Sequence, residues 1–178
     1  LKITDRLNAK TRVFIERSPF VCLATADARQ HCDLSPRGDP AGFVHILDER
    51  TLLIPERPGN RLADTLRNVL ANPHIGLLFI VPGVTDTFRV NGRATLTTDA
   101  ALLAPCAVEG KTPKLGILVD IDEAYTQCAK AFIRSGLVDP QGITVHPLLQ
   151  EDMAAAFPGR HRLTRLKLLT LKDLADET

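Results

Sequence analysis

Hydrophobic and polar positions follow two different periods along this chain. Apolar residues at every second position, or in short unbroken runs, are typical of strands, and apolar residues three and four positions apart are typical of helices. The strand-like segments are 20–25, 31–35, 43–47, 51–54, 75–81, 86–97 and 114–121. The helix-like segments are 3–17, 62–70, 99–105 and 123–135. The pattern predicts six or seven short strands with three or four helices inserted among them.

Short turns join most of the predicted strands. A parallel pair needs a crossover of a dozen or more residues, so these turns predict antiparallel pairing. We expect a mainly β fold with peripheral helices (α+β), in which a closed or half-closed antiparallel barrel protects the edges of the sheet. A length of 178 residues suits one domain. Within it we expect an N-terminal helix to residue 17, a barrel core over 18–140 and a C-terminal extension over 141–178.

Composition and charge narrow the possible functions. Lys and Arg number 22 against 21 Asp and Glu. The resulting formal charge of +1 argues against nucleic-acid binding, which normally goes with a large basic excess. The longest apolar run, 75–81, is too short to span a bilayer, so we expect no membrane partner. The four cysteines form no Cys-x-x-Cys pair and the five histidines lack metal-ligand spacing, which predicts free thiols, a cytoplasmic location and no metal.

The first candidate site is Asp33-Leu34-Ser35-Pro36-Arg37-Gly38-Asp39, a strand that we expect to break into a rigid turn from Pro36 onward. Ser35 and Arg37 are two residues apart, so on extended backbone they project to the same side. A hydroxyl beside a guanidinium suits an anionic oxygen, because arginine can donate two hydrogen bonds to a phosphate. A solvated turn with an ordinary Arg–Asp pair explains the same residues.

The second candidate site is Ile54-Pro55-Glu56-Arg57-Pro58-Gly59-Asn60-Arg61, in which a strand runs through a loop into a helix. Asn60 is a favourable N-cap, and the first turn of a helix offers free N–H groups to a phosphate. Arg57 and Arg61 add positive charge at this point. The alternative is ordinary helix capping with solvated arginines.

The third segment of interest is the strand Thr87-Phe88-Arg89-Val90-Asn91-Gly92-Arg93-Ala94. Its alternation predicts one core face and one polar face, and Gly92 inside it predicts a bulge or a close backbone approach. No Gly-x-Ser-x-Gly sequence and no Gly-x-Gly-x-x-Gly sequence is present, so neither a serine hydrolase elbow nor a dinucleotide loop is indicated.

Taken together and in this order, these segments resemble the pyridoxamine-5′-phosphate-oxidase-like flavoproteins, a family of FMN-binding split β-barrels. The resemblance covers residues 12–140. The segments that carry it are 18–25, 33–39, 55–61, 66–68, 88–94 and 128–135. The resemblance implies an antiparallel split β-barrel that binds FMN.

The resemblance also implies a homodimer with two FMN sites at the interface, each built from both chains. Ser35, Pro36 and Arg37 would then lie along the flavin and its ribityl phosphate. Thr87 takes the position of a glutamine near the flavin ring, which the partner chain contributes.

The phosphate would be held by Arg57, Asn60 and Arg61. Related barrels bind a deazaflavin or haem, but these arginines favour a flavin that ends in a phosphate. The chain lacks tryptophan and therefore the Trp-x-Arg-x-Arg-Leu segment of the oxidase itself, so pyridoxamine phosphate is not the expected substrate.

A small barrel that shares a cofactor between two chains exposes a large apolar face when alone. We expect the strand face of Phe88, Val90 and Ala94 to be the surface where the two chains meet.

Three functions remain open. The first is an FMN-dependent oxidoreductase that acts on an unidentified small molecule, with no catalytic residue assigned. The second is a flavin-binding protein without turnover, for storage or sensing. The third is an interaction protein that uses the basic stretch Arg160–Lys172 and binds no flavin.

Overall fold

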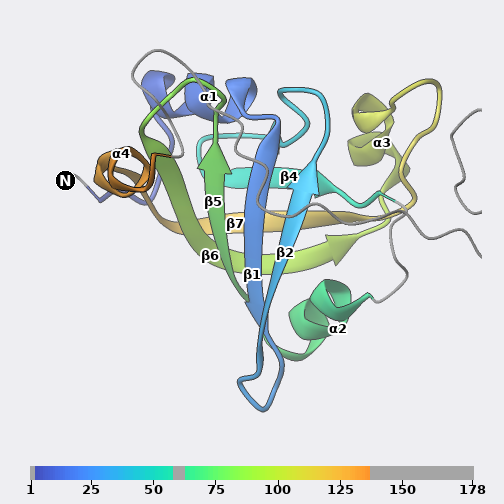
Figure 1. The fold of residues 1–178 in the computed structure, drawn as a ribbon. Coiled ribbons are helices and arrows are strands. Elements are labelled where there is room, and N and C mark those ends of the chain that lie inside the picture. Colours follow the sequence, from blue (N-terminus) through green and yellow to red (C-terminus); the bar gives the residue numbers. More distant parts are fainter. Residues whose placement is uncertain (1–2, 58–62, 137–178) are drawn as a thin grey trace, which may run out of the picture. The chain divides into compact units, whose positions relative to one another are not determined.

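The computed structural model describes residues 3–57 and 63–136 (Figure 1). Seven strands form one antiparallel sheet in the order β2-β1-β5-β6-β7-β4-β3. The strands are β1 Phe20–Ala26, β2 Cys32–Gly38, β3 His45–Ile46, β4 Thr51–Pro55, β5 His74–Ile80, β6 Thr87–Thr97 and β7 Gly116–Gln127. The helices are α1 Ala9–Arg17, α2 Asp64–Ala71, α3 Ala100–Leu103, the 3₁₀ helix η1 Ala104–Cys106, and α4 Lys130–Ser135.

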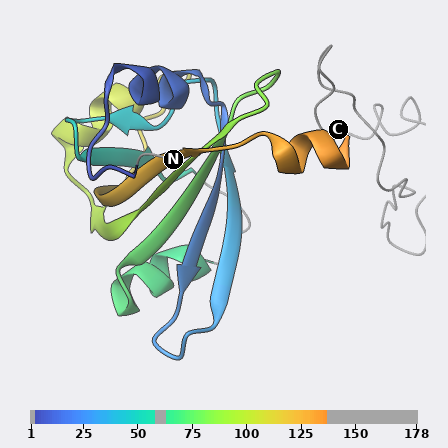
Figure 2. The same ribbon diagram turned by 90° about the vertical axis from the view of Figure 1, so that its left-hand side faces the viewer.

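The predicted fold class, an antiparallel β fold with peripheral helices, is confirmed. Figures 1 and 2 show α1 at one end of the sheet and α2 at the other. The two outermost strands, β2 and β3, do not pair with each other in the described part of the chain, so the sheet there is open rather than closed into a barrel. No helix among residues 3–57 and 63–136 is long and apolar enough to cross a membrane.

The hydrophobic core lies on one face of the sheet, where alternate residues of β1, β5 and β6 are buried. Phe88 of β6 is fully buried and packs against Phe79 of β5 and Phe14 of α1, with ring centroids 6.2 and 5.9 Å apart. Val90 is also fully buried, and Ala94 is 3% exposed. The expectation that Phe88, Val90 and Ala94 form a surface between two chains is therefore wrong. Elements of the same chain cover this face, because an apolar strand face is buried against the nearest available apolar element.

Helix α1 begins at Ala9, later than the predicted start at residue 3. Asn8 caps it, since its side-chain oxygen accepts hydrogen bonds from the backbone N–H groups of Lys10 and Thr11. The Thr11 hydroxyl accepts a bond from the Asn8 N–H in return, which completes a capping box. Residues 3–7 are not helical, and Thr4 exchanges two backbone hydrogen bonds with Ala124 of β7 at 3.1 and 2.6 Å.

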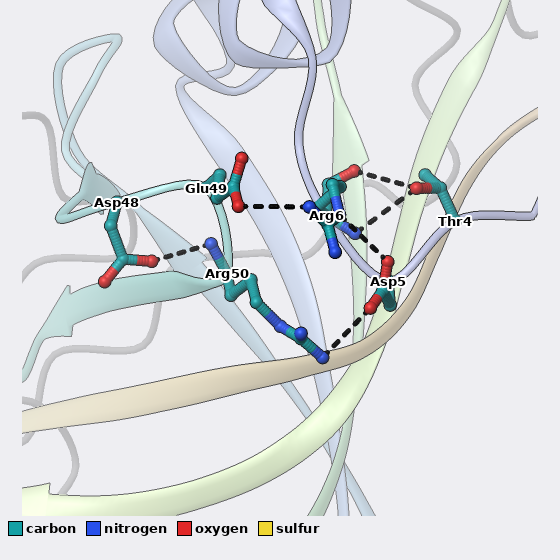
Figure 3. A network of polar contacts seen from close by, with 6 residues as sticks. All are labelled: Thr4, Asp5, Arg6, Asp48, Glu49 and Arg50. Carbon is teal, nitrogen blue, oxygen red and sulfur yellow. Dashed lines mark hydrogen bonds and ion pairs between the residues drawn. The ribbon is translucent and has the colours of Figure 1, made fainter.

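Polar contacts hold this N-terminal segment against the turn between β3 and β4 (Figure 3). Arg6 pairs with Glu49 at 3.3 Å, and Arg50 pairs with Asp5 at 3.0 Å. The backbone N–H of Leu7 also donates to the Glu49 carbonyl at 2.7 Å. The Arg6 side chain, with Arg50, holds the pKa of Asp5 below its ordinary value. All four charged side chains are about half exposed, so the pairs orient the segment more than they stabilise the fold.

The end of β7 departs from the helix predicted over residues 123–135. The strand continues to Gln127, and helix α4 starts only at Lys130. Pairing with β6 decides this outcome: Ala124 lies opposite Val90 and is fully buried. The register shifts between Asn91 and Gly92, where a Cβ on Gly92 would collide with the carbonyl oxygen of Asp120. The bulge or close approach predicted at Gly92 is therefore confirmed, and the extra residue of the bulge is Asp122 of β7, which the register skips.

Candidate functional site

Strand β2 runs through Pro36 to Gly38, whereas the sequence predicted a break at Pro36. An edge strand tolerates proline because half of its N–H groups have no strand to pair with, and β2 is an edge of this sheet. The continuous strand places Asp33, Ser35 and Arg37 on one partly buried face. Ser35 and Arg37 therefore share a face, as their spacing predicted. The Pro36 ring lies on the opposite, exposed face, and its carbonyl accepts a bond from Arg37 Nη1 at 3.1 Å.

Thr65, in the first turn of α2, joins these side chains into one polar cluster. Its hydroxyl is 3.3 Å from both Asp33 Oδ2 and Ser35 Oγ, and it accepts a bond from Arg37 Nη2 at 3.2 Å. Ser35 Oγ donates to Asp33 Oδ2 at 2.9 Å. Thr65 itself is only 3% exposed. One guanidinium and two hydroxyls thus meet at the edge of the sheet, next to the start of a helix.

The position of α2 explains why Thr65 lies there. Asn68, one turn further along, donates a buried hydrogen bond to the hydroxyl of Thr25 on β1 at 3.0 Å. Thr65 and Asn68 are both buried, so they form a polar stripe on the inner face of an amphipathic helix. Neither residue is among the site residues that the sequence predicts. The available signal was two polar residues three positions apart on the face that the helix buries.

Arg37 also faces Glu56 at the end of β4. Arg37 Nε and Glu56 Oε2 are 3.6 Å apart, which is an ion pair but too long for a hydrogen bond. Both atoms are buried, and neither has a hydrogen-bond partner within the described residues. Burial raises the pKa of Glu56, and the nearby Arg37 offsets part of that rise. A buried guanidinium N–H without a hydrogen bond costs free energy, and an added acceptor would recover it.

Arg57 is held separately from this cluster. Its Nε donates to Asp39 Oδ2 at 2.6 Å, and its Nη2 donates to the Cys106 carbonyl at 2.8 Å. These bonds tie the ends of β2 and β4 to the segment after α3. Because Glu56 and Arg57 are consecutive, the Arg37–Glu56 and Asp39–Arg57 pairs form a short row of charges along the same end of the sheet.

The remaining predicted residues lie apart from this row or outside the described residues. Thr87 is buried at the start of β6, three strands from β2, which is roughly 14 Å along a sheet at the usual strand spacing. One chain therefore does not bring Thr87 to Arg37.

Asn60 and Arg61 lie outside the described residues. The N-cap position of α2 is Ala63, at φ +54°, so the prediction that Asn60 caps this helix is wrong.

Comparisons with known proteins agree with this fold. Residues 7–128 match the family model described as pyridoxamine 5′-phosphate oxidase. No curated protein matches the chain. Among solved structures, HupZ from Group A Streptococcus has a TM-score of 0.57 and 17% identity, over 68% of this chain and 94% of that one. General Stress Protein 26 from Bacillus anthracis str. Sterne has a TM-score of 0.51 and 16% identity, over 66% of this chain and 90% of that one.

At these identities the two solved structures support the fold alone. The family model spans more than half of the chain, and the part that it matches runs from α1 to the end of β7. It includes the strand and the helix that carry Ser35, Arg37 and Thr65, and also Glu56, which directly follows β4. The chain belongs to the pyridoxamine 5′-phosphate oxidase family.

Proposed function

We propose that this protein binds FMN and that Arg37, Ser35 and Thr65 receive the phosphate group. One observation carries the proposal: the Nε of Arg37 is buried without a hydrogen bond, beside two hydroxyl groups. A phosphate oxygen is an acceptor that would satisfy this N–H, and arginine binds phosphate with two parallel donors. Membership of the family supports a flavin as the molecule that carries the phosphate.

The residues present include the kinds of donor that bind a phosphate, and the Arg37 guanidinium also faces the Glu56 carboxylate. The guanidinium supplies the positive charge, and the hydroxyls of Ser35 and Thr65 can rotate to donate. The first turn of α2 adds the partial positive charge of a helix N-terminus. Asp33 opposes binding, because its carboxylate accepts bonds from the same two hydroxyls. The hydroxyls must therefore turn away from Asp33 when the anion arrives.

Asn60 and Arg61 are part of the proposal as further phosphate ligands. They lie outside the described residues, but the segment that contains them is flanked by Arg57 and by the start of α2. Arg57 already donates to Asp39 and to Cys106, so we assign it a supporting role in which it holds the ends of β2 and β4 in place beside the phosphate.

We further propose an FMN-dependent oxidoreductase that acts on a small molecule. FMN, when bound, would accept and pass on a hydride or two electrons. The role of this chain is to bind the phosphate end firmly and to orient the ring by doing so.

The four cysteines, which all carry free thiols, support a reducing compartment and hence a cytoplasmic location.

We propose that the protein is a homodimer through the outer face of β2, β1 and β5. Leu34 is 68% exposed on this face, and Ala24 beside it in register is exposed as well. Cys22 and Leu78 pair directly and are partly exposed on the same face. Large apolar side chains on an uncovered sheet face are typical of interaction surfaces. In such a dimer, Thr87 of one copy would complete the FMN site of the other.

A titration of the purified protein with FMN tests the proposal. We expect quenching of flavin fluorescence at about one FMN per chain, with a dimeric mass by light scattering in the same sample. No binding at micromolar FMN would contradict the assignment. Oxidation of NADPH by the loaded protein, with a screen of acceptors, would then separate an oxidoreductase from a flavin-binding protein without turnover.

A further inference from the structure

A pocket beside the Arg37 cluster, with which it shares Glu56, lies between the end of β4 and the segment that precedes β7. Its volume is about 490 Å³, within the range of pockets that bind small molecules. Val108, Pro113 and Leu115 give it apolar walls, and Arg57 lies at its side. The FMN proposal assigns no ligand to this space.

The walls of the pocket are held in place by hydrogen bonds. The Arg57 guanidinium is fixed by Asp39 and by the Cys106 carbonyl. The backbone N–H of Glu56 donates to the Leu115 carbonyl at 2.9 Å. Val108 and Lys111 exchange two backbone hydrogen bonds, at 3.2 and 2.9 Å. The pocket is therefore formed before any ligand arrives, which lowers the entropy cost of binding.

The turn between Val108 and Lys111 carries backbone strain. Glu109 has φ +50° and Gly110 has φ +75°. Glycine adopts this left-handed conformation freely, but a glutamate there is unfavourable and persists only where the surroundings impose it. The turn positions Lys111 on the rim of the pocket.

The charges around the pocket favour an anion. Arg57 is neutralised by Asp39, and Glu56 faces Arg37. Lys111 and Lys114 line the pocket, and neither has a carboxylate within ion-pair distance among the described residues. Glu109 is the one other carboxylate among the lining residues. Among the groups without an ion pair, Lys111 and Lys114 therefore outnumber Glu109. The pocket has an excess of positive charge beside its apolar walls.

We propose that this pocket binds a small organic carboxylate with a compact apolar body. The body would pack on Val108, Pro113 and Leu115, and the carboxylate would pair with Lys111 and Lys114. This ligand is additional to FMN, and its binding does not require the flavin.

Calorimetric titration with 2-naphthoate, and with 2-naphthylmethanol as its neutral counterpart, tests the proposal. We expect one naphthoate per chain and an affinity at least about tenfold above that of the alcohol, because only the anion gains charge-assisted hydrogen bonds. The double variant Lys111→Met/Lys114→Met should lose this preference. Lys10→Met, which removes an exposed lysine on α1, should keep it.

The same titrations repeated with saturating FMN separate this site from the flavin site. Unchanged naphthoate binding supports a second site. Displacement of naphthoate by FMN, equal affinity for the acid and the alcohol, or an equal loss in Lys10→Met would overturn the proposal. A protein that binds FMN but not naphthoate would refute this inference and leave the flavin proposal standing.

Discussion

The guanidinium of Arg37 on β2 donates a hydrogen bond to the hydroxyl of Thr65 on α2, at 3.2 Å and across 28 positions of sequence. This bond joins the edge strand to the first turn of the helix. Arg37 lies between Thr65 on one side and Glu56 on the other, and the contact with Glu56 is not a hydrogen bond. The Nε of Arg37 can therefore donate to an added anion without breaking an existing hydrogen bond.

Removing Arg37 should weaken FMN binding selectively. A charge-assisted hydrogen bond contributes about 1.5–3 kcal/mol, so Arg37→Ala should raise the Kd for FMN roughly tenfold to a hundredfold. Riboflavin lacks the phosphate, and its weaker binding should hardly change. Fluorescence titration with both ligands measures the difference.

Arg67→Ala is the matched control for this experiment, because Arg67 is an exposed residue of α2 whose ion pair is with Asp64 of the same helix. Equal losses of FMN and riboflavin in Arg37→Ala would indicate a damaged fold. No loss of either ligand would refute the phosphate assignment.

The hydroxyl of Thr65 should matter for stability as well as for binding. Thr65→Val keeps the shape of the side chain but leaves Asp33, Ser35 and Arg37 without a shared partner. We expect a loss of about 1–3 kcal/mol in the free energy of unfolding, the usual cost of buried polar groups that lose a partner. Urea denaturation measures it. Thr65→Ser retains the hydroxyl and should recover most of the loss; an equally unstable serine variant would argue against the hydrogen bonds.

Gly92 is required by the close approach of β6 and β7. Gly92→Ala would place a Cβ against the Asp120 carbonyl oxygen, which backbone atoms cannot easily avoid. We expect a loss of about 1–3 kcal/mol in the free energy of unfolding, as for other overpacked sites. Gly38→Ala is the comparison, since its nearest contacts are at ordinary distances of 3.4 and 3.7 Å. Similar stability of the two variants in thermal unfolding would refute the collision.

The pH dependence of stability should carry a contribution from Glu56. Its pKa is raised in the folded protein because the carboxyl is buried, so the folded state binds this proton more tightly than the unfolded state. The stabilising contribution is complete below the unfolded pKa and is lost as pH rises through the folded pKa. Glu56→Gln stays neutral throughout, so it should gain stability relative to the wild type as pH rises from the ordinary glutamate pKa of 4.5.

Denaturant unfolding at several pH values measures this difference. Glu16→Gln, at an exposed position of α1, is the control. A constant difference between Glu56→Gln and the wild type across the pH range would show that Glu56 does not titrate as proposed.

A charge on the outer face of β2 should dissociate the proposed dimer. Leu34→Arg places a guanidinium on an apolar surface that a second copy would desolvate, which costs several kcal/mol for an unpaired charge. We expect the mass measured by light scattering to fall to that of a monomer. Leu70→Arg changes an even more exposed leucine, on α2, and should not alter the mass. A monomeric wild type, or a Leu34→Arg dimer, would refute this interface.

The features that depend on neighbouring residues could be predicted before the fold was known. The apolar run of β1, the alternation in β6 and the short turns between strands were enough to predict the antiparallel sheet. The spacing of Ser35 and Arg37 was enough to place them on one face, and Gly92 was enough to predict the bulge. These features follow from the two-residue period of a strand and from the missing Cβ of glycine. Both properties can be recognised in a short stretch of sequence.

The features that depend on a distant partner could not be predicted from local sequence. Ala124 has the spacing of a helical stripe, yet it lies on β7 because β6 offers it Val90 as a partner and a buried position. The face of β6 that carries Phe88 is part of the core because Phe14 of α1 packs against it. Thr65 lies in the site because the hydrogen bond from Asn68 to Thr25 holds α2 against β1. Local periodicity does not distinguish these outcomes, because the free energy of burial and pairing comes from residues tens of positions away.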